Sequence, residues 1–274
     1  MAIKLSELDP LVLVLGSSGF ASYAQLGALW FLSYTHLLRN VKTYVGCSVG
    51  AIISLLLASG YQPLEVINDD KVLASLIEYI QGIKPAQLTT LVTQSGLLTL
   101  DPLKDYLTKK MTTKFGFVPT MKQLYDLRGC ELVTVTVNVA KNQTVYLSRD
   151  NHPTLSVVEA VLLSVNFPLL VQKYTLEGDP YIDGSFGNPY PVDYMDDGDI
   201  HILGITVVDT PSPCDSLITY LYRSIRHPIE EIRTRIIDNS SDKCFHLVLT
   251  VEGGKTTGEV LLSGMDQAKR YYSS

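Results

Sequence analysis

The sequence predicts an α/β fold, a three-layer sandwich in which helices cover both faces of a mainly parallel central sheet. The first observation is that short runs of β-branched and apolar residues alternate with longer stretches of helical apolar spacing. The second is that no internal repeat, low-complexity tract or Pro/Ser-rich linker divides the chain, so residues 1–274 predict a single domain. Strands joined by helices pair in parallel, and a parallel sheet needs cover on both faces.

The N-terminal part of the chain twice repeats a strand, a turn of small residues and a helix. The expected elements are a strand at 11–15, a turn at 16–19, a helix at 26–37, a strand at 43–45, a turn at 46–50 and a helix at 51–58. Gly60 and Pro63 then supply a stop signal for the second helix.

The middle of the chain, residues 64–127, predicts several helices, and Asp101 with Pro102 gives one of them a start signal. Strands return after it. The runs rich in apolar or β-branched residues are 131–139, 144–147, 181–182, 201–208 and 245–251.

Composition and charge exclude several classes of protein. The net charge is −6 and no block of Lys or Arg occurs, so we expect no nucleic-acid partner. The four cysteines form no CxxC pair, which is typical of reduced thiols in the cytoplasm rather than of a zinc site; they are Cys47, Cys130, Cys214 and Cys244. The Asp pairs at 69–70 and 196–197 lack a calcium-loop pattern, so we expect no metal and no cofactor.

No segment predicts a membrane span or a secretory signal. Glu7 and Asp9 precede the first apolar run, which lacks a basic start and a cleavage pattern. The longest apolar helix candidate, residues 49–59, is much shorter than the ~20 residues that cross a bilayer. We therefore expect a cytoplasmic protein whose contact with membranes, if any, is peripheral.

The turn at 46–50 has the pattern Gly-x-Ser-x-Gly, which predicts a nucleophilic Ser48. A serine on a tight strand-to-helix turn needs small neighbours, here Gly46 and Gly50, so that the backbone can bend and the hydroxyl stand clear. The positive end of the following helix can stabilise a developing oxyanion. The alternative is a plain helix N-cap, and only the strand, the helix and the upstream turn favour the nucleophile. The adjacent Cys47 is interpreted as a small buried residue.

Two kinds of base could serve this serine. A histidine after the acid would be expected in an α/β-hydrolase, and three histidines follow at His201, His227 and His246. Their settings favour ordinary packing or a solvated surface, and only two strands precede Ser48, too few for that fold. Asp183 instead follows a short apolar segment and could end a strand beside the turn at 46–50. Taken alone, Asp183-Gly184 is also typical of a hairpin turn.

Taken in order, these segments resemble the patatin-like phospholipase family. Its marks are a glycine-rich oxyanion loop after the first strand, an early GxSxG elbow and a distant Asp-Gly-Gly/Ala. The matching segments are 13–29, 45–58, 96–98 with 101–103, 160–168 and 181–192, so the resemblance is strongest within 11–208. It implies a patatin-like fold and a dyad in which Asp183 is the base for Ser48, without histidine, metal or cofactor.

The oxyanion loop departs from the family pattern. Residues 17–22, Ser-Ser-Gly-Phe-Ala-Ser, stand where the family usually shows Gly-Gly-Gly-x-Arg/Lys-Gly. The resemblance implies that the backbone amides of Ser17, Ser18 and Gly19 hold the oxyanion. A serine at positive φ there would be strained, and the loss of the basic residue removes a cation near the loop. Ser185 replaces the third Gly/Ala of the Asp-Gly motif.

The resemblance implies hydrolysis of a carboxylic ester of a phospholipid or lysophospholipid through an acyl-serine intermediate, with peripheral contact with lipid. The alternative is a catalytically silent lipid-binding or interaction protein on the same fold. The small-residue turn at 16–19 could also bind the phosphates of a nucleotide. The sequence contains neither GxxxxGK[ST] nor GxGxxG, so it does not favour this interpretation.

Residues 216–239 carry an apolar stripe opposite four arginines. The arginines are Arg223, Arg226, Arg233 and Arg235. This pattern predicts a core-facing helix with a solvated basic face, kinked or restarted at Pro228. Seating of the basic face on anionic lipid is the alternative.

Overall fold

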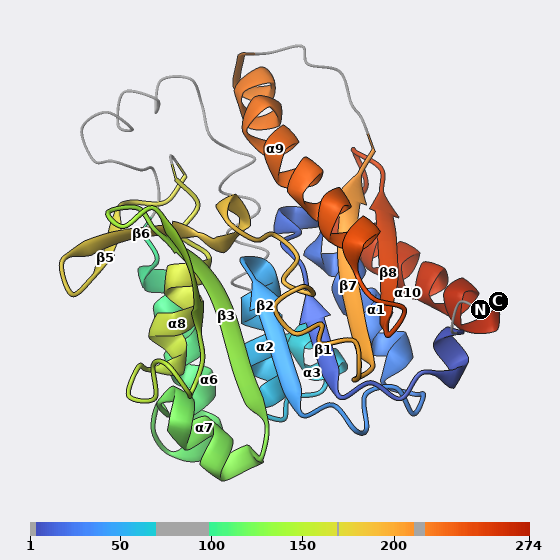
Figure 1. The fold of residues 1–274 in the computed structure, drawn as a ribbon, viewed down its shortest axis with the longest axis horizontal. Coiled ribbons are helices and arrows are strands. Elements are labelled where there is room, and N and C mark those ends of the chain that lie inside the picture. The colour runs from blue at the N-terminus through green and yellow to red at the C-terminus, as the bar shows by residue number, and fades with distance from the viewer. Residues whose placement is uncertain (1–3, 70–98, 169, 211–216) are drawn as a thin grey trace.

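The structure, a computed structural model, describes residues 4–69, 99–168, 170–210 and 217–274. The predicted α/β fold with a mainly parallel central sheet is confirmed (Figure 1). The described strands are β1 (Val12–Leu15), β2 (Thr43–Cys47), β3 (Glu131–Asn138), β4 (Gln143–Leu147), β5 (Tyr174–Leu176), β6 (Asp179–Asp183), β7 (Ile202–Asp209) and β8 (Cys244–Val251). Their order is β5-β6-β3-β2-β1-β7-β8, and β4 pairs with β3.

The strands β3, β2, β1, β7 and β8 form the parallel part of the sheet, and β4, β5 and β6 are antiparallel to their neighbours. The short strand β5 was missed by the sequence patterns because it has only three residues. A hairpin turn joins it to β6, with Glu177 and Gly178 both at positive φ, 52° and 89°. Two consecutive positive φ angles suit the right-handed twist of a hairpin.

Alternate residues of the central strands enter two separate cores. In β1, Leu13 and Leu15 belong to one apolar cluster, whereas Val12 and Val14 belong to the other. Successive side chains of a strand point to opposite faces, so an unbroken apolar run such as Val-Leu-Val-Leu needs cover on both. This explains why every residue of β1 is buried.

The larger core lies under helices that pack on one face of the sheet. They are α1 (Ser22–Leu32), α2 (Val49–Ala58), α8 (Val157–Ser164) and α10 (Thr257–Ser273), with α3 (Pro63–Asn68), α6 (Asp101–Phe115) and α7 (Met121–Arg128) beyond them. The helix expected at 26–37 thus begins and ends earlier, as α1. Pro102 stands in the first turn of α6, as its start signal predicts.

The opposite face is covered by residues 190–200 and by α9 (Leu217–Asn239). In Figure 1, α9 crosses in front of β7 while α1 and α10 lie behind the sheet. Ile236 and Ile237 of α9 pack against the smaller core. The helix continues through Pro228 rather than restarting there. Part of the predicted helical stretch 64–127, residues 70–98 with Asp70 and the matching segment 96–98, lies outside the described residues, as do Cys214 and Ser216.

Candidate active site

The register of the sheet brings Ser48 and Asp183 together. Residues 131–135 of β3 pair with β2, residues 136–138 pair with β6, and β4 occupies the other edge of β3. Therefore β2 and β6 lie end to end along one edge. Because β2 is parallel and β6 antiparallel to β3, their carboxyl ends face each other, with Cys47 opposite Val135 and Asp183 opposite Thr136. Ser48 follows Cys47 directly.

Ser48 occupies a strained turn between β2 and α2. Its backbone has φ 57° and ψ −128°, and its hydroxyl makes no N-cap bond to the helix. Instead, Ser48 Oγ donates a hydrogen bond of 2.6 Å to Asp183 Oδ2. A β-carbon at Gly50 would lie 2.3 Å from the Leu15 carbonyl oxygen, and one at Gly46 would lie 2.5 Å from Ala51 Cα. The glycines are therefore required by close packing, and the N-cap interpretation is wrong.

Asp183 is a buried carboxyl group at the end of β6, 1% exposed. Burial raises its pKa from 3.8 to about 6, although hydrogen bonds from Ser48 and Ser185 act in the opposite direction. The Ser185 amide donates to Asp183 Oδ1 at 2.8 Å, which caps the 3₁₀ turn at Gly184–Phe186. The hairpin interpretation of Asp183-Gly184 is wrong, because the hairpin lies at Glu177 and Gly178.

The last residue of α8 and the segment after it hold both members of this pair. Ser164 Oγ accepts a hydrogen bond from the Ser48 amide at 3.0 Å, and the Asn166 carbonyl accepts one from the Asp183 amide at 2.9 Å. Asn166 Nδ2 also donates to the Tyr181 carbonyl at 2.7 Å. The roles of Ser164 and Asn166 were not predicted from the sequence. The available signal was a serine and an asparagine beside the apolar end of a helix.

The loop after β1 accommodates its serines without backbone strain. Ser18 has φ −138°, and the positive φ of 49° falls on Gly19. The Ser17 amide donates to the Pro189 carbonyl at 2.7 Å, so it is engaged away from any oxyanion. This corrects the expectation that the Ser17 amide is an oxyanion donor. Within the described residues, the Ser18 and Gly19 amides donate to no acceptor.

Two buried side chains tie this loop to the rest of the molecule. Gln25 Nε2 donates to the Gly16 carbonyl at 2.9 Å, and Ser18 Oγ donates to Gln25 Oε1 at 2.9 Å. Arg233 Nη2 donates to the Ser17 carbonyl at 2.8 Å. Arg233 is 1% exposed, which corrects the prediction of a wholly solvated basic face on this helix. A cation absent from the loop sequence therefore reaches the loop from α9.

His246 and Cys47 were the other candidates for base and nucleophile, and their surroundings favour neither role. His246 Nδ1 is 2.9 Å from Tyr190 Oη, and burial lowers the pKa of this histidine. Burial and then the nearby Asp183 raise the pKa of the Cys47 thiol well above its ordinary value, so the thiolate is disfavoured. Ser48 Oγ is hydrogen-bonded to the carboxylate of Asp183.

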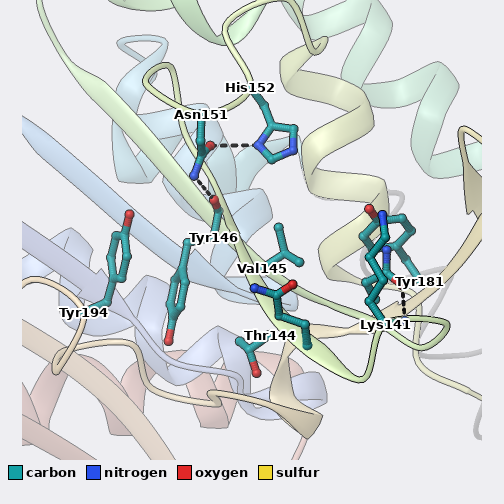
Figure 2. A pocket seen from close by; sticks show the side chains of 10 residues that line it. Lys141, Thr144, Val145, Tyr146, Asn151, His152, Tyr181 and Tyr194 are labelled. Carbon is teal, nitrogen blue, oxygen red and sulfur yellow. Dashed lines mark hydrogen bonds between the residues drawn. The ribbon is translucent and has the colours of Figure 1, made fainter.

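A polar cavity of about 380 Å³ lies beside the edge strand β4 (Figure 2). The rings of Tyr146 and Tyr194 stack there, with centroids 3.9 Å apart. Its lining residues are Asn138, Lys141, Gln143, Thr144, Val145, Tyr146, Asn151, His152, Tyr181 and Tyr194. Ser48 and Asp183 are not among them. Among the described helices, none is long and apolar enough to span a bilayer.

A serine on a Gly-x-Ser-x-Gly turn at the carboxyl edge of a parallel sheet defines a class of α/β hydrolytic site. The family model described as patatin-like phospholipase matches residues 13–196, and the chain belongs to this family. It is 30% identical over 207 residues to an uncharacterized protein of Acanthamoeba polyphaga mimivirus, covering 74% of this chain and 67% of that one. A probable lipid hydrolase of Invertebrate iridescent virus 6 is 25% identical over 187 residues, covering 66% and 61%.

The fold is also shared with solved bacterial proteins. VipD from Legionella pneumophila matches with a TM-score of 0.57 and 15% identity, over 98% of this chain and 67% of that chain. ExoU, in its complex with SpcU from the type III secretion system of Pseudomonas aeruginosa, matches with a TM-score of 0.55 and 17% identity, over 97% and 52%. The chain thus spans about half the length of ExoU. Family and relatives together support a lipid hydrolase.

Proposed function

We propose that the protein cleaves a carboxylic ester of a phospholipid or lysophospholipid through an acyl-Ser48 intermediate, with Asp183 as the base. The observation that carries this proposal is the 2.6 Å hydrogen bond from Ser48 Oγ to Asp183 Oδ2. A nucleophile and its base must lie within hydrogen-bonding reach of each other. A distant Asp183 would have favoured a silent lipid-binding protein, so this geometry supports the enzyme.

In the acylation step, Asp183 accepts the Ser48 proton while Oγ attacks the ester carbonyl carbon. The tetrahedral intermediate expels the alcohol, which takes the proton from Asp183 and leaves acyl-Ser48. Asp183 then takes a proton from water, whose oxygen attacks the acyl carbon, and the fatty acid leaves as Ser48 recovers its proton. A carboxylate with a pKa of about 6 is a stronger base than an ordinary aspartate and is still ionised near neutral pH.

The negative charge on the carbonyl oxygen would be held by the Ser18 and Gly19 amides and by the amino end of α2. Backbone amides aimed at a developing oxyanion are a large source of catalysis. The first-turn amides of a helix have no partner within the helix, and α2 begins directly after Ser48. We also propose peripheral contact with a lipid surface, because the substrate resides there.

The test is release of fatty acid from mixed phospholipid and lysophospholipid vesicles by wild type, Ser48→Ala and Asp183→Asn. We expect both variants to lose release by a factor of about 10³ or more while they remain folded by thermal melting. Ser54→Ala is the matched control, since it removes a buried serine hydroxyl of α2 that bonds to the Val45 carbonyl, and it should keep activity. Equal release from wild type and Ser48→Ala, or none from wild type, would contradict the proposal.

A further inference from the structure

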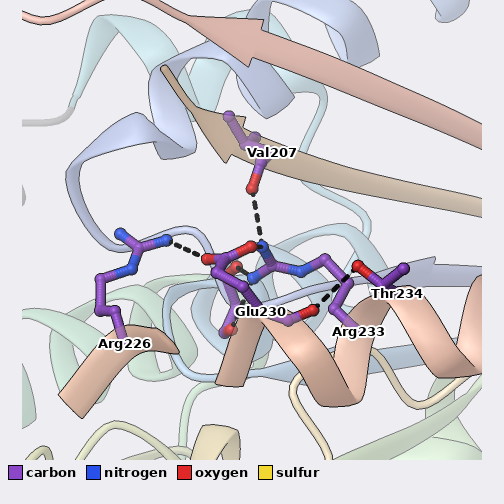
Figure 3. A network of polar contacts seen from close by, with 6 residues as sticks. Val207, Arg226, Glu230, Arg233 and Thr234 are labelled. Atoms are coloured by element: carbon purple, nitrogen blue, oxygen red, sulfur yellow. Dashed lines mark hydrogen bonds and ion pairs between the residues drawn. The ribbon is translucent and has the colours of Figure 1, made fainter. Parts of the chain in front are cut away.

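Arg233 is a buried cation whose hydrogen-bonding groups converge on the oxyanion loop. Arginine is rarely buried this fully unless it is paired. Its guanidinium donates to the Ser17 carbonyl at 2.8 Å. It also donates to the Val207 carbonyl at 3.1 Å and to the Glu230 carboxylate (Figure 3). A weaker bond of 3.3 Å reaches Ser17 Oγ. The side chain thus connects α9 and β7 to the loop that follows β1.

We propose that Arg233 is a positioning residue that aims and polarises the Ser18 amide as an oxyanion donor; this inference rests on the proposed function. The Ser17 carbonyl and the Ser18 N–H belong to one peptide unit. That unit is planar and trans, so its C=O and N–H point in opposite directions. A guanidinium that grips the carbonyl therefore fixes the direction of the amide. It also strengthens the amide as a donor, because hydrogen bonds in series polarise one another.

The neighbouring polar groups of the loop already have partners, which leaves the Ser18 and Gly19 amides as the donors open to an oxyanion. The Ser17 amide is bonded to the Pro189 carbonyl, and the Gly16 carbonyl is bonded to Gln25. The Ser18 hydroxyl is bonded to Gln25 as well. Buried backbone groups need partners, and an arriving oxyanion would supply one to the Ser18 and Gly19 amides.

Glu230 keeps the buried guanidinium from being an uncompensated charge. It lies one turn before Arg233 on α9 and pairs with both Arg233 and Arg226, which is visible in Figure 3. Loss of one partner from a buried ion pair is costly because the other charge remains. Arg233 Nε has no hydrogen-bond partner although it is buried. The side chain therefore leaves its Nε–H unpaired, while its Nη groups bond to the loop, to β7 and to Glu230.

The test compares Arg233→Gln and Arg233→Lys with wild type on a water-soluble short-chain aryl ester. We expect kcat to fall by about 10- to 100-fold in Arg233→Gln with KM changed less than twofold, since the donor is needed mainly in the transition state. Inhibition by an alkyl trifluoromethyl ketone, whose adduct carries the oxyanion, should weaken by the same factor. Arg233→Lys should be intermediate, because an ammonium can donate to the Ser17 carbonyl but lacks the planar fork.

Arg235→Gln is the control on the same helix, since Arg235 is exposed and should keep kcat and ketone affinity. A purely structural role would lower the melting temperature without changing kcat per folded molecule or ketone affinity. That result, or a folded Arg233→Gln with wild-type kcat beside an inactive Ser48→Ala, overturns the inference and leaves the proposed function intact. Should Arg233→Gln fail to fold, unchanged ketone affinity in Arg233→Lys overturns it. An inactive wild type overturns both proposals.

Discussion

The serine–aspartate pair and the oxyanion loop are held in place by different means. The pair is positioned by main-chain register, because β2 and β6 meet end to end along β3 and present Ser48 and Asp183 to each other. The loop is positioned by side chains, Gln25 from α1 and Arg233 from α9, that reach its carbonyls. The first arrangement is encoded locally in two motifs, whereas the second depends on a residue more than 200 positions away.

This difference explains how the loop can contain serines in place of glycines. A glycine-rich loop obtains its shape from backbone freedom. Here positive φ is confined to Gly19, and the serines adopt ordinary angles while side-chain hydrogen bonds fix their peptide units. The pair should therefore be most sensitive to changes in backbone packing, and the loop to the loss of its two anchors.

The largest effect should come from closing the space at the elbow. In Gly50→Ala the new methyl group would meet the Leu15 carbonyl oxygen, so β1 and α2 must separate. We expect a loss of about 3 kcal/mol in the free energy of unfolding. Activity should fall by about 100-fold or more, since small displacements of reacting groups are costly. Denaturant unfolding and ester hydrolysis measure the two effects.

The matched control is Gly258→Ala, in the first turn of α10. A methyl group there meets open space, and Gly258 has no positive φ. It should keep full activity and gain up to about 1 kcal/mol of stability from helix propensity. A Gly50→Ala variant as stable and active as Gly258→Ala would show that backbone packing does not position the pair.

The next effect concerns the protonation of Asp183. Because burial raises the pKa of this carboxyl to about 6, kcat/KM should fall tenfold for each pH unit below about pH 6. A profile that stays flat down to pH 4 would show that an ionised Asp183 is not the base. The measurement is the pH dependence of kcat/KM on a soluble ester between pH 4 and 8.

The same burial should make Asp183 a cost to stability at neutral pH. The folded state binds the proton more tightly than the unfolded chain, so the group's stabilising contribution is complete below about pH 4 and is lost as pH rises through about 6. At about 1.4 kcal/mol for each pH unit between 3.8 and about 6, the loss is about 3 kcal/mol. Asp183→Asn should therefore be more stable than wild type at pH 7, and this difference should disappear at pH 4.

Much of the fold and the pair could be predicted from the sequence because their signals are local. The apolar run of β1, the Gly-x-Ser-x-Gly turn and the Asp183-Gly184 motif each carry their meaning within a few residues. The engagement of the Ser17 amide by Pro189 could not be predicted, because it depends on how the chain returns after β6. The burial of Arg233 was also missed, since its helical position on α9 matches the exposed face as well as the buried one.

The smallest effect should come from the second anchor of the loop, Gln25. Gln25→Met keeps the side chain's length and removes the donor to the Gly16 carbonyl and the acceptor for Ser18 Oγ. The Gly16 carbonyl and the Ser18 hydroxyl would lose their buried hydrogen-bond partner, which should cost about 1–3 kcal/mol of stability. We expect kcat to fall by about tenfold, because the Ser18 peptide unit would be less firmly oriented. Ser54→Ala also loses a buried hydrogen bond, to the Val45 carbonyl rather than to the loop, and should lose stability but not kcat. If both variants lose stability and neither loses kcat, then Gln25 holds the fold rather than the oxyanion donors, and Arg233 alone remains as the anchor of the loop.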